Sequence, residues 1–224
     1  MESKQINQRL KDIYHKLMTA YGQQHWWPAK EPFEVMVGAI LTQSTAWQNA
    51  EKAIVNLRAV KALSPEAIRR LPIQELAQII RPCGYYNAKA LKLKSLVDWL
   101  GKYYHDNLNE LFACDVEDLR QQLLSIYGIG QETNDSILLY AAKKPVFVID
   151  AYTRRITSRI GLVQDSNSYA AYQQLFIANL PSNTQLFNEY HALLVKLAKD
   201  ACRKKPTCDK CCLNNICQFY VASG

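Results

Sequence analysis

Apolar residues recur at helical spacing along almost the whole chain. Near the N-terminus, Ile6, Leu10, Ile13, Leu17 and Tyr21 follow one another at intervals of three or four residues, which places them on one face of a helix. The same periodicity predicts further helices over residues 33–41, 46–60, 74–81, 87–104, 131–143, 151–160, 168–180 and 185–200. We therefore expect an all-α protein.

Helix start signals agree with this pattern. Ser64 precedes Pro65 and Glu66, an order typical of an N-cap, a first-turn proline and an acidic side chain near the positive end of a helix. Asp115 begins another predicted helix in the same way. Residues 145–149 form an apolar run that is typical of a strand but too short to found a sheet.

Composition narrows the class of protein. The chain has 224 residues, 49% of them hydrophobic, which is enough to bury a core in one domain or two small lobes. A formal charge of +7 favours a polyanionic partner. No apolar run is long enough for a membrane span and the N-terminus lacks a secretory signal. We expect a cytoplasmic monomer, associated with the nucleoid if the source is bacterial or archaeal.

Cysteines near the C-terminus are the strongest chemical signal. Cys202, Cys208, Cys211 and Cys217 form a C-x5-C-x2-C-x5-C pattern, as expected of thiolates that hold a metal centre. Disulfides are disfavoured, because seven cysteines leave one unpaired and nothing indicates export. One short segment supplies all four ligands, which favours a 4Fe-4S cluster over the alternative, tetrahedral zinc. The adjacent Cys212 is a possible substitute ligand.

A glycine-containing turn joins two predicted helices near the middle of the chain. Gly128, Ile129 and Gly130 lie between Leu123–Tyr127 and the helix that begins at residue 131. Glycine permits backbone angles closed to other residues, and the N–H groups at the next helix start can bind a phosphate. An ordinary helix–helix turn with a glycine cap is the alternative.

An apolar run then ends in a carboxylate. Asp150 follows Val146–Ile149 and precedes Ala151-Tyr152-Thr153-Arg154-Arg155. Read by itself, Asp150 is an ordinary helix N-cap. The hairpin, Asp150 and the four cysteines follow one another along the chain, however, and in this order they resemble the helix-hairpin-helix/Gly-Pro-Asp superfamily of DNA base-excision glycosylases. The cysteines match the cluster loop of the endonuclease III branch of that superfamily.

The resemblance implies a fold and a division of the chain. It implies two all-α lobes that flank a DNA-binding cleft. Residues 30–138 would form a six-helix lobe ending in the hairpin, whereas residues 1–29 and 139–224 would form a discontinuous lobe that carries the cluster loop at 202–217. Asp150 would lie at the cleft, where an anion stabilises the positive charge that develops on the sugar during glycosidic cleavage.

Two further positions define the expected reaction and substrate. Bifunctional relatives carry a lysine where this chain has Glu132, so the resemblance implies a monofunctional glycosylase without AP lyase activity. Trp26, Trp27 and Trp47 resemble the aromatic residues that sandwich the flipped base in the 3-methyladenine DNA glycosylase III group, in a pocket that would include Glu132. Indole faces attract cations, which suits an alkylated purine such as 3-methyladenine.

Other residues are candidate contacts to double-stranded DNA. Gln43 matches a family glutamine that fills the gap left by an extruded base. Lys89, Arg203 and Lys204 are candidate phosphate contacts, together with the Gly128–Gly130 hairpin. His191 is expected to be a hydrogen-bonded core residue. Two alternatives stay open: an endonuclease III-like glycosylase/AP lyase for oxidised pyrimidines, and a non-catalytic DNA-binding protein.

Overall fold

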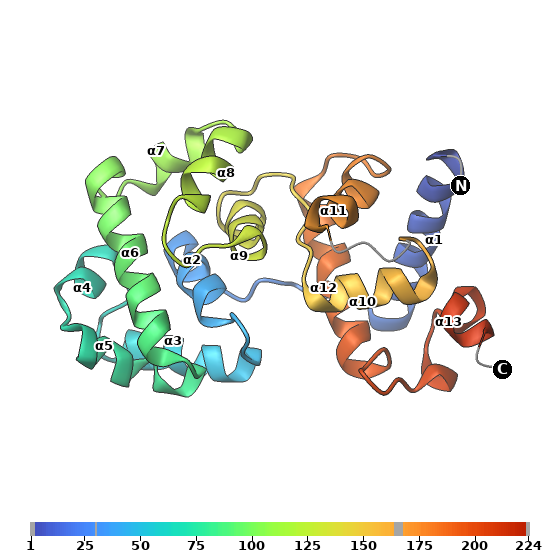
Figure 1. The fold of residues 1–224 in the computed structure, drawn as a ribbon, viewed down its shortest axis with the longest axis horizontal. Helices are drawn as coiled ribbons and strands as arrows, with labels where there is room; N and C mark the ends of the chain where they lie inside the picture. Colours follow the sequence, from blue (N-terminus) through green and yellow to red (C-terminus); the bar gives the residue numbers. More distant parts are fainter. Residues whose placement is uncertain (1–2, 30, 164–167, 223–224) are drawn as a thin grey trace. The chain divides into compact units, whose positions relative to one another are not determined.

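The computed structural model describes residues 3–29, 31–163 and 168–222, and within these ranges it contains helices and no β-strand (Figure 1). The all-α prediction is confirmed. The chain divides into two compact units: unit 1 comprises Met1–Trp26 and Pro145–Gly224, and unit 2 comprises Trp27–Lys144. No helix of the described part is both long and apolar enough to cross a membrane.

Unit 2 extends a few residues beyond each of the expected boundaries at 30 and 138. At its beginning, the Trp27 ring packs 5.2 Å from the Tyr140 ring, measured between centroids. At its end, Lys144 Nζ donates a 2.9 Å hydrogen bond to the Cys114 carbonyl. These contacts belong to the core and surface of unit 2, which explains why the observed boundary lies outside them.

The core of unit 2 is organised around α2, which is buried along nearly its whole length. A helix that is apolar on all sides is stable only when other helices cover every face, and α3, α6 and α9 pack against it. The helical elements of unit 2 are α2 (Pro32–Leu41), α3 (Trp47–Ala59), α4 (Pro65–Arg70), α5 (Ile73–Ile79), η1 (Arg81–Cys83), α6 (Tyr86–Tyr104), α7 (Leu108–Ala113), α8 (Val116–Leu124), α9 (Gln131–Ser136) and the π-helical η2 (Ile137–Ala141).

Local sequence signals placed most of these elements to within a few residues. Ser64 Oγ accepts a 3.2 Å bond from Ala67 N–H, and Asp115 Oδ1 accepts a 2.8 Å bond from Glu117 N–H, as the start signals predicted. The periodicity missed the short helix α7. It also predicted a continuous helix over 131–143, where the structure changes from α to π geometry after Ser136.

In unit 1, α12 packs against both α1 and α10. Its buried side includes Phe187, Tyr190, Leu193, Leu194 and Leu197. The helical elements of unit 1 are α1 (Ser3–Tyr21), α10 (Ala151–Ile160), α11 (Tyr169–Ile177), α12 (Thr184–Asp200), η3 (Cys208–Lys210), η4 (Asn214–Ile216) and α13 (Gln218–Val221).

Residues 145–149 are not a strand but an extended segment that is buried inside unit 1. Phe147 stacks on Phe176 with ring centroids 3.7 Å apart. Its carbonyl accepts a 2.8 Å bond from Gln173 Nε2, and Ile149 N–H donates a 3.2 Å bond to the Tyr169 hydroxyl. Side chains therefore satisfy backbone groups that would otherwise need a neighbouring strand. This segment delivers Asp150 to the start of α10.

Lys89 is an internal cation of unit 2. Its side chain is only 2% exposed, and Nζ donates to the carbonyls of Leu41 and Cys83 at 2.8 Å and to Thr45 Oγ1 at 3.0 Å. Burial lowers the pKa of this ammonium group from its usual value. The prediction that Lys89 contacts DNA phosphate is therefore wrong, because its charge is used to join α6 to the ends of α2 and η1.

We expect Lys89→Met to lower the free energy of unfolding by about 2–4 kcal/mol, because two buried carbonyls lose their donor. Urea unfolding measures this change. Lys102→Met is the matched control, since Lys102 is an exposed lysine on the same helix, and its effect should stay within about 0.5 kcal/mol. Equal effects of the two substitutions would contradict the internal role of Lys89.

Candidate active site

Asp150 occupies the N-cap position of α10, and its carboxylate is held by two different groups of unit 1. Asp150 Oδ1 accepts a 2.7 Å hydrogen bond from Thr153 N–H, the usual N-cap contact. Asp150 Oδ2 lies 3.7 Å from His191 Nε2 on α12. The side chain of Asp150 is 14% exposed and that of His191 is 7% exposed, so the pair is largely shielded from bulk water.

The surroundings of Asp150 favour its charged form. Burial by itself acts to raise the pKa of this carboxyl group, but the His191 imidazole and the Thr153 amide outweigh burial and hold the pKa below its usual value. Asp150 is consequently an anion at neutral pH although it is mostly buried. A fixed anion of this kind can stabilise a positive charge that develops next to it.

His191 was expected to be a buried core residue, and it is 6% exposed. No sequence pattern indicated that His191 contacts Asp150. The two residues lie on different helices, and only the packing of α10 against α12 brings them together. The sequence shows a histidine among apolar positions of a helix, which indicates a buried side chain but does not indicate that Asp150 is its neighbour.

The predicted hairpin connects α8 to α9 in unit 2. Gly128 has a φ of 85°, a left-handed conformation that favours glycine, and a Cβ at this position would lie 2.3 Å from Lys92 Cγ. Ile129 is 5% exposed and anchors the turn in the core. Gly130 is exposed at the N-cap of α9, and a Cβ there would meet no atom within 4 Å. The turn thus has an open side at the start of α9.

Gln43 is attached to this hairpin. Its Nε2 donates 2.9 Å hydrogen bonds to the Gly128 carbonyl and to Thr133 Oγ1, while its Oε1 accepts a 2.5 Å bond from Lys92 Nζ. The loop after α2 is therefore tied to both ends of the hairpin. These three bonds use both N–H donors and one of the two acceptor lone pairs of the Gln43 amide, so the side chain is held in place in this structure.

Two of the predicted base-pocket tryptophans come together in unit 2. Trp27 and Trp47 meet edge to face with ring centroids 5.2 Å apart, and Trp27 also meets Tyr140 at 5.2 Å. Gly38 makes room for this group, because a Cβ there would lie 2.9 Å from the Trp27 ring. Sequence reasoning did not identify Tyr140 or Gly38, which read as ordinary helix residues. Glu132 lies in the first turn of α9 and is exposed.

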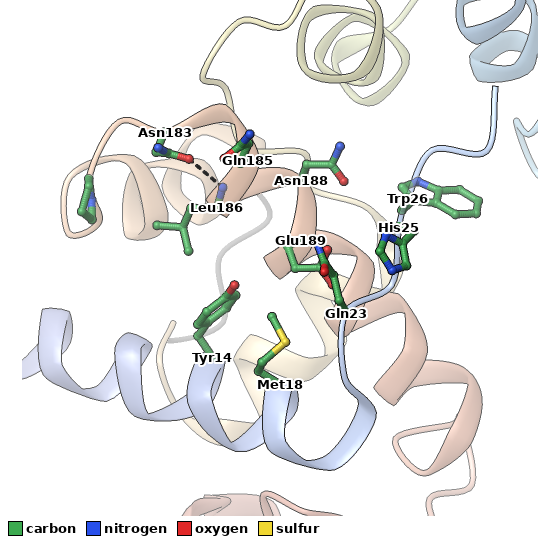
Figure 2. Close-up of a pocket in the computed structure, with 11 residues that line it drawn as sticks. Tyr14, Met18, Gln23, His25, Trp26, Asn183, Gln185, Leu186, Asn188 and Glu189 are labelled. Carbon is green, nitrogen blue, oxygen red and sulfur yellow. Dashed lines mark hydrogen bonds between the residues drawn. The ribbon is translucent and has the colours of Figure 1, made fainter. Parts of the chain in front are cut away.

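Trp26 belongs to unit 1, where it lines an open pocket of about 600 Å³ (Figure 2). Tyr14 and Met18 of α1 and Leu186 and Glu189 of α12 line the same pocket. Glu189 Oε1 accepts a 2.5 Å bond from the backbone N–H of Gln24, which ties the segment before Trp26 to α12. Asp150 does not line this pocket, so the pocket is separate from the candidate catalytic carboxylate.

The other basic residues differ in whether their side chains are exposed enough to contact a DNA phosphate. Arg203 and Lys204 are exposed, as a phosphate contact requires. By contrast, Lys94, another lysine of α6, donates 2.8 Å bonds to the carbonyls of Ile68 and Arg69 at the end of α4. The carbonyls of Arg203 and Lys204 accept bonds from Arg159, which fixes the backbone of this loop. Arg203 Nε also donates a 2.8 Å bond to the Lys199 carbonyl, while both residues remain exposed.

The four predicted ligand cysteines line one small pocket in unit 1: Cys202, Cys208, Cys211 and Cys217. Arg159 contacts two of their sulfur atoms, with Nη1 3.4 Å from Cys202 Sγ and its carbonyl 3.4 Å from Cys217 Sγ. All seven cysteines are free thiols. Cys212 is not one of the residues that line the pocket.

The chemistry of this donor set fits a cationic centre. Burial and the neighbouring thiols raise the pKa of Cys211 to about 11, because several thiolates in one pocket repel one another unless a positive charge lies between them. Within the described ranges, no group of three or more His, Cys, Asp or Glu side chains has the arrangement needed for a single metal ion. Four thiols thus surround one pocket without converging on one point.

Comparisons with known proteins agree with these features. The model of the HhH-GPD superfamily of base excision DNA repair proteins matches residues 37–181. MJ1434 of Methanocaldococcus jannaschii, whose name describes it as a DNA repair glycosylase, is 44% identical over 207 residues, which are 92% of this chain and 94% of the relative. An endonuclease III of Sulfolobus acidocaldarius is 30% identical over 190 residues, 84% of this chain and 82% of the relative.

Solved structures show the same fold. The H. pylori 3-methyladenine DNA glycosylase MagIII bound to 1,N6-ethenoadenine has a TM-score of 0.73 and 27% identity, over 89% of this chain and 98% of that one. A trapped endonuclease III–DNA covalent intermediate has a TM-score of 0.83 at 19% identity, over 97% of this chain and 98% of that one.

Fold, hairpin and family match together define a DNA-binding protein of base excision repair, and the chain belongs to the HhH-GPD superfamily. Within that superfamily it is a DNA glycosylase, an enzyme class that cleaves N-glycosyl bonds. The family resemblance read from the hairpin, Asp150 and the cysteines is confirmed.

We expect Gly128→Ala to lower the free energy of unfolding by about 1–3 kcal/mol, since the new methyl group occupies a left-handed position and displaces Lys92 from Gln43. Chemical denaturation measures the loss. Gly130→Ala is the matched control in the same turn, and we expect a change within about 0.5 kcal/mol because its φ is −94° and its surroundings are open. A larger loss from Gly130→Ala would refute this account.

Proposed function

We propose that this chain is a monofunctional DNA glycosylase that hydrolyses the N-glycosidic bond of an alkylated purine such as 3-methyladenine. The observation that carries the proposal is the shielded carboxylate of Asp150, fixed through one oxygen by the start of α10. Loss of a base leaves positive charge on the sugar, and an anion that is already in place stabilises that charge without reorganisation. Asp150 would also orient the attacking water.

The absence of lyase activity is proposed from Glu132. Family relatives that nick the strand use a lysine amine at this position of the hairpin, whereas this chain offers an exposed carboxylate in the first turn of α9. A carboxylate cannot form the Schiff base that strand scission requires. Lys89, a lysine of the same unit, is held by buried acceptors and is unsuited to replace it.

The substrate class is proposed from the aromatic group of unit 2. Trp27 and Trp47 present indole rings that attract a cationic base, and a glycosylase must take its base out of the helix to reach the bond. We also propose Trp26 and Glu132 as base-recognition residues. The similarity to MagIII, whose structure holds 1,N6-ethenoadenine, supports a modified purine. A cationic base is also an activated leaving group, so little acid catalysis is needed.

We propose that the hairpin, Arg203 and Lys204 bind phosphates of double-stranded DNA. The open side of Gly130 leaves the N–H groups at the start of α9 accessible, and both basic side chains are exposed. Gln43 would enter the DNA helix where the base has left. It would first have to exchange its bonds to Gly128 and Thr133 for contacts with the nucleic acid.

The thiols of unit 1 would hold a 4Fe-4S cluster, with zinc as the alternative. Four sulfur atoms around one pocket suit a cubane, whose ligands bind separate iron atoms, better than a single zinc ion, which needs its ligands about 2.3 Å from one point. Cys202, Cys208, Cys211 and Cys217 would be the ligands. The cluster would fix the loop that carries Arg203 and Lys204, and no chemical step is assigned to it.

A second candidate function is a glycosylase/AP lyase of the endonuclease III type for oxidised pyrimidines. The 30% identity to the endonuclease III of S. acidocaldarius favours it, and Glu132 opposes it. Borohydride trapping separates the two: a covalent protein–DNA adduct with the wild type would support the lyase. Binding of damaged DNA without release of any base would support a non-catalytic protein instead.

We expect Asp150→Asn to reduce release of the damaged base by at least about 10²-fold, because the amide carries no negative charge. The assay is a panel of duplexes that carry 3-methyladenine, 7-methylguanine, thymine glycol, uracil or a mismatch, with free base and strand breaks scored separately. The wild type should release an alkylated purine and leave the strand intact.

The matched control is Asp115→Asn. Asp115 is also a helix N-cap whose carboxylate accepts a backbone N–H bond, so the substitution makes the same chemical change at a residue to which no catalytic role is assigned. It should leave base release unchanged. If Asp150→Asn retains full activity, Asp150 is only an N-cap and the proposed mechanism is wrong.

We expect Cys208→Ser to lose the bound iron and the visible absorption of an iron-sulfur cluster, because one thiolate ligand is missing. Iron, sulfide and zinc analysis of the purified protein measures this loss. Cys212→Ser is the matched control and should retain the wild-type iron content, since Cys212 does not line the pocket. Stoichiometric zinc without iron in the wild type would overturn the cluster assignment.

A further inference from the structure

His191 is buried beside the candidate catalytic carboxylate, although nothing in the proposed chemistry uses it. Its Nε2 lies 3.7 Å from Asp150 Oδ2, close enough for an ion pair and too long for a direct hydrogen bond. The ring is held edge to face against Phe147, with centroids 6.5 Å apart. Since Phe147 itself stacks on Phe176, the imidazole is placed by packing as well as by charge.

The carboxylate has one oxygen committed and one directed at the histidine. Thr153 N–H occupies Asp150 Oδ1 at 2.7 Å. Asp150 Oδ2 does not take part in this N-cap bond, and His191 Nε2 lies 3.7 Å from it. When Nε2 carries its proton, the imidazole presents an N–H dipole to Oδ2, which favours the charged carboxylate over the neutral acid.

Other ionisable groups on the surrounding elements are directed to other partners. On α10, the Arg154 guanidinium lies over the rings of Tyr169 and Tyr172, and Arg155 Nε donates to the Cys202 carbonyl. The Tyr169 hydroxyl of α11 accepts a bond from Ile149 N–H. On α12, the Tyr190 hydroxyl donates to the Leu10 carbonyl and Glu189 accepts from Gln24 N–H. The ring of Tyr14 on α1 packs on Tyr190.

We propose that His191 is a positioning residue that orients the second oxygen of Asp150 and keeps this carboxylate an anion, an inference that rests on the proposed function of Asp150. His191 does not touch the substrate in this account. It acts through Asp150, and together with the Thr153 amide it keeps a largely buried acid charged.

The proposal predicts the direction in which the pKa of Asp150 changes when His191 is replaced. Burial favours the neutral acid, and without the imidazole only the Thr153 amide opposes burial, so the pKa of Asp150 rises in a His191 variant. The active anion is then lost at a higher pH than in the wild type. Above the raised pKa the anion returns, and most of the rate returns with it.

We would measure single-turnover release of 3-methyladenine from methylated duplex DNA as a function of pH for the wild type, His191→Leu and His191→Gln. The acid limb of the profile should move upward by about one pH unit in His191→Leu and by less in His191→Gln, whose amide can still donate to Oδ2. His15→Leu is the matched control, because His15 is an exposed histidine of the same unit, and its profile should match the wild type.

Profiles of both His191 variants that superimpose on the wild type would overturn the proposal. This outcome differs from failure of the proposed function, which would appear as full activity in Asp150→Asn or as no base release by the wild type. Titration of the Asp150 carboxyl carbon by NMR gives a readout independent of activity. If His191→Leu does not fold, the wild type and His191→Gln decide the question by the same titration, in which an unchanged Asp150 pKa refutes the role of His191.

Discussion

A carboxylate held in a largely dry setting is the constraint on which the local structure of unit 1 depends. Removing a charge from water costs several kcal/mol unless hydrogen bonds and opposite charge replace the lost solvation. For Asp150 the replacement comes from the start of α10 and from His191 on α12. The buried segment of residues 145–149 must therefore end at one defined point, and contacts with Tyr169 and Gln173 on α11 fix it there.

In unit 2 the buried charge is positive, and it too is stabilised by hydrogen bonds that replace water. Lys89 joins three acceptors in the core, and Lys92 holds Gln43 against the hairpin. The chain has a formal charge of +7, but part of that positive charge stabilises loops and is unavailable to a polyanion. The DNA contacts proposed above are therefore assigned to exposed basic residues near the cysteines and not inferred from net charge. Charge counts indicate a class of partner, whereas burial decides which residues meet it.

In this family, a shared fold does not by itself determine which reaction a protein catalyses. The chain shares a fold with endonuclease III at a TM-score of 0.83 although only 19% of residues are identical. A scaffold of this kind carries different reactions when a few side chains change. In the function proposed above, the type of reaction depends on Glu132 in the first turn of α9, and the lesion depends on the aromatic group around Trp27.

The sequence alone determined the helices, the hairpin and the cysteine pattern, because each is encoded by residues that are neighbours along the chain. Periodicity, caps and glycine positions are local, so they located most helices and placed Asp150 at a helix start. The tertiary structure decided what local signals cannot contain: that Lys89 faces inward, that Tyr140 meets Trp27, and that His191 lies beside Asp150. These outcomes arise from packing between segments far apart in sequence, where burial and charge pairing act together.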